Sequence, residues 1–489
     1  MIPALVNECE PLHHETDYLK FKLVMKINVH NLGVIKQAEF ELGDLTIICG
    51  KNNSGKTYVA YAVFGFLATW REGFDVEIAN DVIDRILNQG LATINLNSDI
   101  DSPEQILSQA CQAYTKNLAE IFGAERAKFA QTSFEVFLDL NGNFLDHGYE
   151  TNIGASGSNQ QIFSLIKLPN SPELTVTLLA AKENIDFPRQ IIKKIISDAI
   201  KYILFARFFP RPFIASAERT GTAIFRKELN FARNRLLNEL SQVEGEKDRF
   251  ELLFQSYEDY ALPIRANVEF VRNLEAISKR NSQLGEINSS ILDYFDDIIG
   301  GRYVVTKNDE LYYIPTGNKK AQLTMDESSS AVRSLLDIGF YLKHIAQVGE
   351  LLIIDEPELN LHPENQRRIA RLMARLINSG IKVLITTHSD YIVKELNTLI
   401  MLNSDKPHIQ KIAEQAGYQQ DEILDASRVR AYIAEAALVQ LSGKSRRTRC
   451  PTLIAAPITP ELGIEISSFD SAIEAMNKIQ EAIVWGEGF

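Results

Sequence analysis

Residues 50–57 read Gly-Lys-Asn-Asn-Ser-Gly-Lys-Thr and match the pattern G-x-x-x-x-G-K-[ST] of a phosphate-binding loop. Such a loop offers backbone N–H groups and a helix N-terminus to phosphate oxygens. Lys56 is expected to reach the β- and γ-phosphates, and the Thr57 hydroxyl is expected to hold Mg²⁺. The predicted nucleotide-binding residues are Gly50, Asn52, Asn53, Ser54, Gly55, Lys56 and Thr57.

A second stretch whose residues could take part in a reaction is Leu-Leu-Ile-Ile-Asp-Glu at residues 351–356. It predicts a buried strand that ends in two acids. Asp355 would bind Mg²⁺, and Glu356 would accept a proton from an attacking water. Alone, the stretch could be ordinary α/β architecture. Beside a phosphate-binding loop it is a strong match to the Walker B motif.

A third apolar run, residues 381–385, ends in Thr386-Thr387-His388. The His388 imidazole could donate to the γ-phosphate, although a lone histidine is usually just a satisfied polar residue. Upstream, several serines between residues 328 and 334 precede a helix expected to run to about Ala346. Serines there are good helix caps, and they also offer hydroxyl and N–H groups to a phosphate.

The elements that must position these residues form a strand, a loop and a helix. Leu45–Cys49 predicts a buried strand before the loop, and Tyr58–Thr69 predicts a helix after it. Alternating residues from Met25 to Phe40 predict two strands around the turn at residues 31–33. From about residue 71 to 326 the chain is too long for a connection and must form structure of its own.

The expected organisation has six parts. Residues 80–130 are predicted to be mostly helical, and residues 429–433 and 437–441 are predicted to form a hairpin. The predicted parts are an N-terminal arm (1–24), the first half of a nucleotide-binding head (25–70), an inserted α+β region (71–221), a helical lobe (222–300), the second half of the head (301–400) and a C-terminal extension (401–489). The lobe is either compact with a solvated face or an arm that contacts a partner.

Composition narrows the class of protein. The 489 residues carry a net charge of −13, which argues against a wholly basic nucleic-acid-binding surface. Four cysteines without metal-ligand spacing suggest a reducing compartment. Without a signal-peptide pattern or a membrane-length apolar run, we expect a cytoplasmic protein. The basic run at 444–449 is either a solvated loop or a contact to DNA or RNA phosphates.

Taken in order, these motifs resemble the ABC-type ATPase head shared by SMC, RecF and OLD-type proteins. The resemblance covers about residues 25–70 and 320–400. It implies an α/β fold whose mixed sheet carries an antiparallel subsheet. Glu-Pro-Glu-Leu-Asn-Leu-His-Pro at 356–363 is similar to soluble, non-transporter members. The chain most resembles stand-alone ATPases of bacterial anti-phage systems, namely the PtuA proteins of Septu and Septu-bearing retrons and the AriA proteins of PARIS.

The resemblance implies roles for individual residues. Glu356 would be the catalytic base and His388 the switch histidine, with ATP and Mg²⁺ as ligands. Ser329, Ser330 and Arg333 would form a signature that acts on the ATP of a second subunit, in a homodimer or larger homo-oligomer. Ala331 and Val332 depart from the usual L-S-G-G-Q wording of that signature. Glu218 and Arg219 resemble a Glu-Arg pair in the relatives.

The resemblance implies that this ATPase scaffolds or regulates a separate effector nuclease in anti-phage defence. Three alternatives to that function remain. One is a RecF- or SMC-like repair ATPase that binds DNA directly. Another is an ATP-binding scaffold with little turnover. A transporter subunit is disfavoured by the long insertion and the altered signature. No TOPRIM pattern follows His388 and no HNH-like pairing occurs among the eight histidines, so an HNH or TOPRIM nuclease would be a separate chain.

Overall fold

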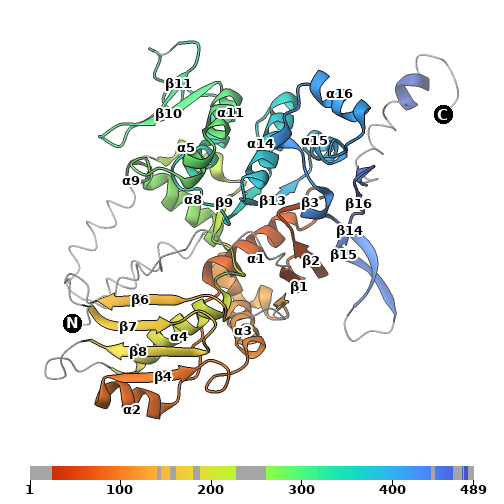
Figure 1. Cartoon of the computed structure of the whole chain (residues 1–489). Coiled ribbons are helices and arrows are strands. Elements are labelled where there is room, and N and C mark those ends of the chain that lie inside the picture. Colours follow the sequence, from red (N-terminus) through yellow and green to blue (C-terminus); the bar gives the residue numbers. More distant parts are fainter. Residues whose placement is uncertain are drawn as a thin grey trace. The chain divides into compact units, whose positions relative to one another are not determined.

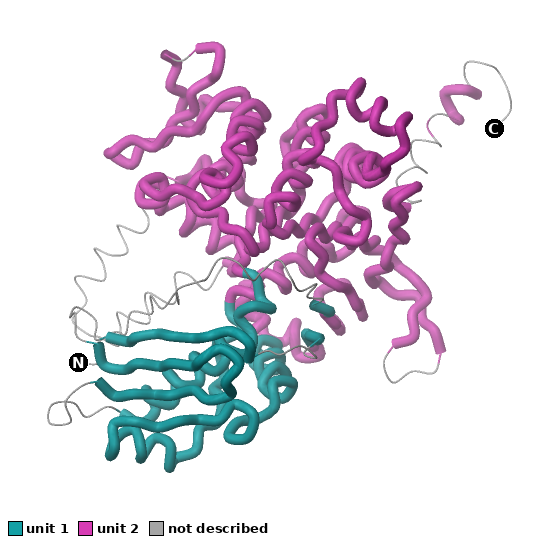
Figure 2. Tube along the Cα trace, viewed as in Figure 1, with its two compact units in different colours: residues 1–26, 69–116, 134–210 teal, residues 27–68, 117–133, 211–489 magenta. Residues whose placement is uncertain are grey.

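The computed structural model describes residues 25–139, 145–154, 161–179, 188–226, 260–318, 320–441, 446–465, 476 and 478–482. Two compact units are distinguished, shown in different colours in Figure 2. Unit 1 takes in residues 69–116 and 134–210 together with the residues before Ile27. Unit 2 takes in residues 27–68, 117–133 and 211 onward.

Unit 2 is built on a six-stranded sheet of order β15-β14-β3-β13-β12-β9 (Figure 1). The strands from β14 to β9 pair in parallel, and β15 pairs with β14 antiparallel. Their bounds are β3 Leu45–Cys49, β9 Pro212–Ala215, β12 Leu351–Asp355, β13 Lys382–Thr387, β14 Val429–Gln440 and β15 Arg447–Ala455. Every residue of β3 and β12 is buried, as expected for central parallel strands covered on both faces.

The helices beside this sheet begin where the sequence signals a start. The predicted helix after the loop is α1, Lys56–Thr69. Between β12 and β13 lies α14, Pro363–Asn378, with Pro363 in its first turn and Gly380 beyond its end at φ +88°. Ser389 caps α15, Asp390–Met401, by accepting from the Ile392 N–H. Because the parallel strands share one direction, the loops after β3, β12, β13 and β9 leave the same edge of the sheet.

Two antiparallel strands precede the loop strand, as the alternation predicted. They are β1, Met25–Leu32, and β2, Ile35–Leu42, and they are neighbours in a second sheet. Gly33 takes positive φ in the turn between them, which falls at residues 33–34, and Asn31 near the end of β1 also has positive φ. The Thr452 hydroxyl of β15 donates to the Gln37 carbonyl of β2 at 2.5 Å. The predicted α/β fold, with a mixed sheet and an antiparallel subsheet, is therefore confirmed.

The lobe of unit 2 is helical where it is described. After α5, Arg219–Ile224, residues 227–259 lie outside the described part of the chain. The lobe continues with α8 Leu262–Arg272, α9 Leu274–Ile277, α10 Gln283–Ile287 and α11 Ser289–Ile299. Beyond the lobe follows the hairpin of β10 Gly301–Val305 and β11 Leu311–Pro315. The helix predicted up to Ala346 is two helices, α12 Ser330–Ser334 and α13 Leu336–His344. The Ser334 carbonyl at this break accepts from the Arg219 guanidinium at 2.7 Å.

Unit 1 contains a four-stranded antiparallel sheet of order β4-β8-β7-β6. The strands are β4 Leu91–Asn95, β6 Tyr149–Gly154, β7 Gln161–Lys167 and β8 Glu173–Leu178. Its helices include α2, Asn80–Gln89, and α4, Arg189–Phe205. The chain also forms α3 Pro103–Ile121, η1 Arg126–Phe129 and β5 Ser133–Leu138. The mostly helical prediction for 80–130 is confirmed by α2, α3 and η1, and it missed only β4, because a five-residue strand gives too little alternation to read.

The prediction of a hairpin at 429–441 was wrong. β14 continues through residues 437–440 and pairs with β15, so the turn falls later in the chain. No Gly, Pro, Asn or Asp stands between residues 433 and 437 to make a tight turn. Arg447 and Arg449 of the basic run therefore lie on a strand and not in a loop. Lys444 of that run and most of the predicted terminal helix at 468–484 lie outside the described residues; residues 476 and 478–482, which are described, are helical.

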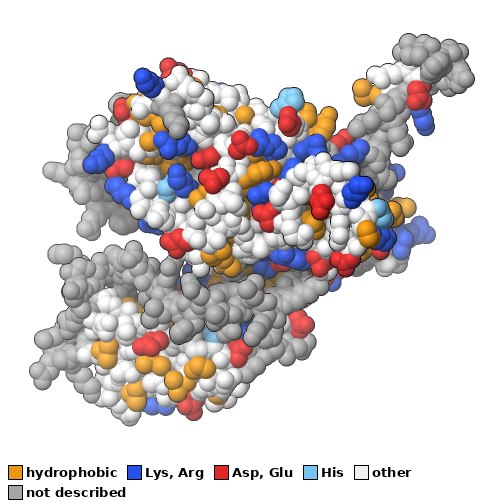
Figure 3. Space-filling view, turned by 45° about the horizontal axis from the view of Figure 1, so that its top comes forward, with side chains coloured by type: hydrophobic (Ala, Val, Ile, Leu, Met, Phe, Trp, Pro, Cys, Tyr) orange, Lys and Arg blue, Asp and Glu red, His pale blue; other side chains and the backbone are white. Residues whose placement is uncertain are grey.

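The remaining elements of the extension are short. They are α16 Pro407–Gln415, η2 Gln420–Glu422, η3 Ala426–Arg428, β16 Ile458–Thr459 and β17 Gly463–Ile464. Among the described helices, none combines the length and the apolar character that crossing a membrane requires. On the face drawn in Figure 3, Lys and Arg side chains are interspersed with Asp and Glu side chains.

Candidate functional site

The phosphate-binding loop depends on two glycines. Gly50 has φ +147°, and a side chain there would meet the Ala434 carbonyl of β14 at 2.6 Å. Gly55 has φ +96°, and a Cβ there would come within 2.9 Å of Ile35 and Val34 beside the β1–β2 turn. Both positions combine a left-handed backbone with close contacts, so a larger residue would distort the loop.

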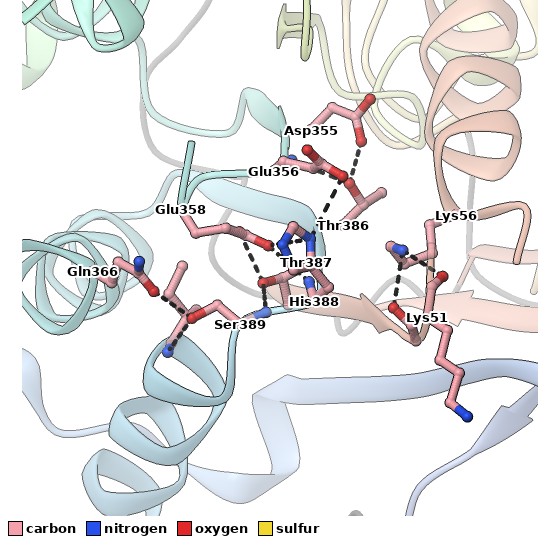
Figure 4. A network of polar contacts seen from close by, with 12 residues as sticks. Lys51, Lys56, Asp355, Glu356, Glu358, Gln366, Thr386, Thr387, His388 and Ser389 are labelled. Atoms are coloured by element: carbon pink, nitrogen blue, oxygen red, sulfur yellow. Dashed lines mark hydrogen bonds and ion pairs between the residues drawn. The ribbon is translucent and has the colours of Figure 1, made fainter. Parts of the chain in front are cut away.

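Lys56 is buried and turned toward the loop. Its ammonium group donates to the carbonyls of Gly50 and Lys51, at 2.9 Å each (Figure 4). These bonds hold the positive charge where the loop curves from β3 into α1. A cation so placed complements phosphate oxygens, as the sequence motif predicts.

Thr57 and Asp355, which are 298 residues apart in the chain, meet across the sheet edge. The Thr57 hydroxyl donates to Asp355 Oδ1 at 3.2 Å, and the Thr386 hydroxyl donates to the same oxygen. Burial raises the pKa of Asp355 to about 6, although the bonds from Thr386 and Thr57 oppose the shift. The structure thus brings together the two residues that the sequence assigned to a metal.

These two residues fit a magnesium ion. Asp355 Oδ2 is buried and accepts no hydrogen bond from any described residue, so a hard oxygen ligand is left over. The described residues hold no group of three or more His, Cys, Asp or Glu able to bind a metal alone. Mg²⁺ at this place would take Asp355 and the Thr57 hydroxyl from the protein and its other ligands from phosphate and water.

Glu356 and His388 also lie together, at the ends of β12 and β13 (Figure 4). His388 Nδ1 is 3.6 Å from Glu356 Oε1 and 3.1 Å from Glu358 Oε1. Glu356 has φ +54°, a conformation uncommon for a residue with a side chain. Its N–H donates to the Thr386 carbonyl at 3.0 Å, which fixes the backbone while the carboxylate stays partly exposed.

Arg219 is a site residue whose role the sequence left undefined. It is 1% exposed, yet its guanidinium donates to four carbonyls, those of Ser216, Ser334, Asp355 and Glu356, at 2.6–2.8 Å. Burial lowers its pKa, and the charges of nearby acids oppose that effect. One side chain therefore joins the end of β9, the end of β12 and helix α12.

Asp337 faces this arginine from the first turn of α13. It is 1% exposed, and neither carboxylate oxygen accepts a hydrogen bond from the described part of the chain. Burial raises the pKa of Asp337 to about 7, and the Arg219 charge offsets only part of that shift. A carboxyl group is therefore kept largely protonated below neutral pH in the folded chain.

Glu218 brings a further acid to the site from the end of β9. It accepts a hydrogen bond from the Tyr61 hydroxyl of α1 at 2.7 Å, and its charge contributes to the raised pKa of Asp355. The roles of Glu218 and Glu358 were missed because neither stands at a motif position to which the sequence assigned a task. The available signals were the Glu-Arg pair at 218–219 and the second acid of Glu-Pro-Glu.

The predicted signature residues do not join this cluster. Ser329 caps α12 by accepting from the Val332 N–H at 3.3 Å, and both Ser329 and Ser330 are exposed. Arg333 donates to the carbonyls of Met325 and Ser328 at 3.0 and 2.5 Å, which holds its own loop. Among the described residues, no hydrogen bond connects Ser329, Ser330 or Arg333 to residues 50–57.

A family model described as an AAA ATPase domain matches residues 24–393, which is well over half of the chain. The chain belongs to this family. The AAA ATPase domain thus includes the phosphate-binding loop, the acids after β12 and His388. No curated protein matches this AAA ATPase.

Three solved structures are similar at low identity. One is an Smc head bound to the C-winged helix domain of ScpA, at 11% identity and TM-score 0.33, covering 88% of this chain and 98% of that one. An Smc head domain with an extended coiled coil, bound to the C-terminal domain of ScpA and derived from Pyrococcus furiosus, is 12% identical with a TM-score of 0.32. That match covers 94% of this chain and 99% of the other. The SMC head domain from Thermotoga maritima is 9% identical with a TM-score of 0.29, and the match covers 89% of this chain and 99% of the other. The family assignment rests on the match over 24–393 and not on these.

Replacing Asp337 by Asn should change how stability depends on pH. Because the pKa of Asp337 is about 7 in the folded chain and 3.8 for an ordinary aspartate, the wild-type chain gains stability as pH falls through that interval and loses it as pH rises. An asparagine does not titrate, so the variant's melting temperature relative to wild type should be higher at pH 8 than at pH 5. Thermal melts at both values measure this.

The exposed Asp326→Asn, in the loop before α12, is the control for removing one acid. A relative melting temperature of Asp337→Asn that stays constant or falls from pH 5 to pH 8 would contradict the burial argument.

Proposed function

We propose that this AAA ATPase uses ATP as a dimerisation signal, with one nucleotide shared between two copies of the chain. The observation that supports this proposal is that the predicted site residues lie in two separate places. The loop at 50–57, Asp355, Glu356 and His388 converge within one chain. Ser329 and Ser330 are exposed, and within the described part of the chain their hydroxyl groups form hydrogen bonds only with residues of α12. A second chain, presenting these serines, would complete the site.

Within the shared site the chain's own residues have separate tasks. The loop amides and Lys56 would bind the phosphates, and Thr57 and Asp355 would hold Mg²⁺, which neutralises phosphate charge. Glu356 would accept the proton of the attacking water, and His388 would donate to the γ-phosphate. Ser329 and Ser330 would contact the γ-phosphate from the partner, and Arg333 would keep their loop in shape.

This arrangement favours a two-fold dimer. Two copies related by a two-fold axis would form two equivalent sites, each with one loop and one signature. ATP then stabilises association because it binds the dimer in preference to the separated chains. Hydrolysis removes the γ-phosphate contacts and releases the partner, so the reaction acts as a timed switch.

The variant Glu356→Gln should trap the ATP-bound dimer. The amide cannot accept the water proton, so hydrolysis should fall by about a hundredfold or more, whereas the phosphate-binding residues remain. Size-exclusion chromatography with light scattering, with and without ATP and Mg²⁺, should then show twice the mass of one chain only with ATP.

Lys56→Ala is the control, because it should remain a single chain under both conditions. A Glu356→Gln protein that binds ATP yet stays a single chain would remove the main support for the shared site. Single-turnover hydrolysis by the wild type also tests the scaffold alternative. A wild-type rate no higher than that of Glu356→Gln would favour an ATP-binding scaffold with little turnover.

The downstream role proposed for this switch is control of a separate effector nuclease in anti-phage defence. Its support is the resemblance of residues 25–70 and 320–400 to the ATPases of those systems. An HNH or TOPRIM nuclease encoded beside this chain would support that role. Housekeeping replication genes in that place would argue against it.

Direct contact with nucleic acid is a second candidate, favoured by the exposed end of β15. Arg446, Arg447 and Arg449 are all exposed there. Opposite residues of an antiparallel pair share a face, so Arg447 and Arg449 lie on the same face as their partners Gln440 and Leu438. Two arginines on one face of an exposed strand can follow a phosphate backbone.

The double variant Arg447→Ala/Arg449→Ala should weaken duplex DNA binding at low salt. The logarithm of the binding constant falls with the logarithm of the salt concentration, and each lost phosphate contact makes this slope less steep by about 0.9. Loss of two contacts should therefore reduce the magnitude of the slope by about 1.8. Fluorescence anisotropy across a salt series measures this, with Lys411→Ala on α16 as a matched exposed cation. Absence of salt-dependent binding by the wild type would dismiss this candidate.

A further inference from the structure

We propose that Glu358 is a positioning residue of the ATPase site, where its carboxylate sets the ring orientation and the proton position of His388. This inference rests on the proposed hydrolysis of ATP at this site. Glu358 does not belong to the acid pair that ends β12, and no role in the reaction follows from its place in the sequence. Its contacts define the role.

Both oxygens of Glu358 are directed at the end of β13. Oε1 accepts the His388 backbone N–H at 2.7 Å and lies 3.1 Å from His388 Nδ1. Oε2 accepts the Thr387 hydroxyl at 2.9 Å. The residue is only 6% exposed, so these contacts replace water almost completely. The carboxylate therefore has one orientation, and that orientation faces the histidine (Figure 4).

The contact determines which ring nitrogen carries a proton. A carboxylate oxygen without a proton only accepts hydrogen bonds, so we assign a proton to Nδ1, the ring nitrogen that faces Glu358 Oε1 at 3.1 Å. Glu356 Oε1, at 3.6 Å from the same nitrogen, reinforces this assignment. Nε2 has no hydrogen-bond partner in the described structure and is the nitrogen left for a phosphate oxygen. In the doubly protonated ring, Nε2–H can donate to that oxygen.

A fixed Nδ1–H also fixes the plane of the ring. Without Glu358 the imidazole could rotate about χ2, which would exchange the positions of Nδ1 and Cδ2 and those of Nε2 and Cε1, because the ring is 45% exposed and Glu356 is the more distant acid. Small errors in the position of a reacting group lower rates strongly. Loss of Glu358 should therefore act on the chemical step and leave nucleotide binding, which depends on the loop at 50–57, almost unchanged.

Glu358 also has a structural contribution, since it satisfies the backbone N–H of His388 and the hydroxyl of Thr387. A double-mutant cycle separates the two roles. Glu358→Ala should lower kcat for ATP by about tenfold to a hundredfold with KM within about twofold of wild type. In the His388→Ala background, Glu358→Ala should change kcat no further.

Two matched variants sharpen the cycle. Glu358→Gln keeps the Oε1 acceptor, so it should retain most of the wild-type kcat. Glu364→Ala removes an exposed acid six residues further on and should have no effect. An equal loss of kcat from Glu358→Ala in both backgrounds would overturn the inference. So would a Glu358→Gln loss as large as that of His388→Ala.

The proton position can be measured without any turnover. Long-range ¹H–¹⁵N spectra of the histidine rings in the full chain identify His388 as the signal lost in His388→Ala. A protonated Nδ1 supports the inference, and an Nδ1 without a proton overturns it. If the wild type hydrolyses no ATP, the proposed function fails while this measurement still decides the role of Glu358. If Glu358→Ala does not fold, this measurement on the wild-type chain still decides the role of Glu358.

Discussion

The buried guanidinium of Arg219 is the interaction on which the geometry of the site depends. Its bonds to the carbonyls of Asp355 and Glu356 fix the backbone that carries both acids. Its bond to the Ser334 carbonyl connects that backbone to the helix behind Ser329 and Ser330. Lysine could not replace it, because one ammonium group cannot reach four carbonyls from separate segments. The two halves of the predicted site are thus held in register by a residue outside both.

This arginine also explains how so many acids can stand together. Asp355, Glu356, Glu358 and Asp337 all act on its charge, and Glu218 is a further acid beside Asp355. Carboxylates this close repel one another, and burial adds to the cost of ionising them. The chain meets this cost with one fixed cation, with hydroxyl donors such as Thr386, and with raised pKa values at Asp355 and Asp337. A phosphate-bound metal ion would add positive charge at the same place.

The sequence predicted the parts of this site that are local. The loop, its strand and its helix are consecutive, so residues 45–69 could be read directly. Arg219, Glu218 and Glu358 could not be assigned in the same way, because their partners come from strands that are adjacent only in the folded sheet. Thr57 and Asp355 were paired through the known order of motifs and not through any signal between them. The error at β14 has a similar cause, since alternation looks alike in one long strand and in two short ones.

β14 carries a consequence for the extent of the functional unit. Its first residues pair with β3, and the Ala434 carbonyl closes off the space beside Gly50. The nucleotide loop is therefore bounded by a strand that begins 36 residues after the family match ends at 393. A fragment that ends at residue 393 would lack β14. The backbone groups of β3 would then have no partners on one side, and the loop would lose its contact with Ala434 beside Gly50. The minimal piece able to keep the loop in shape extends through β14, and β15 covers the edge that β14 would otherwise expose.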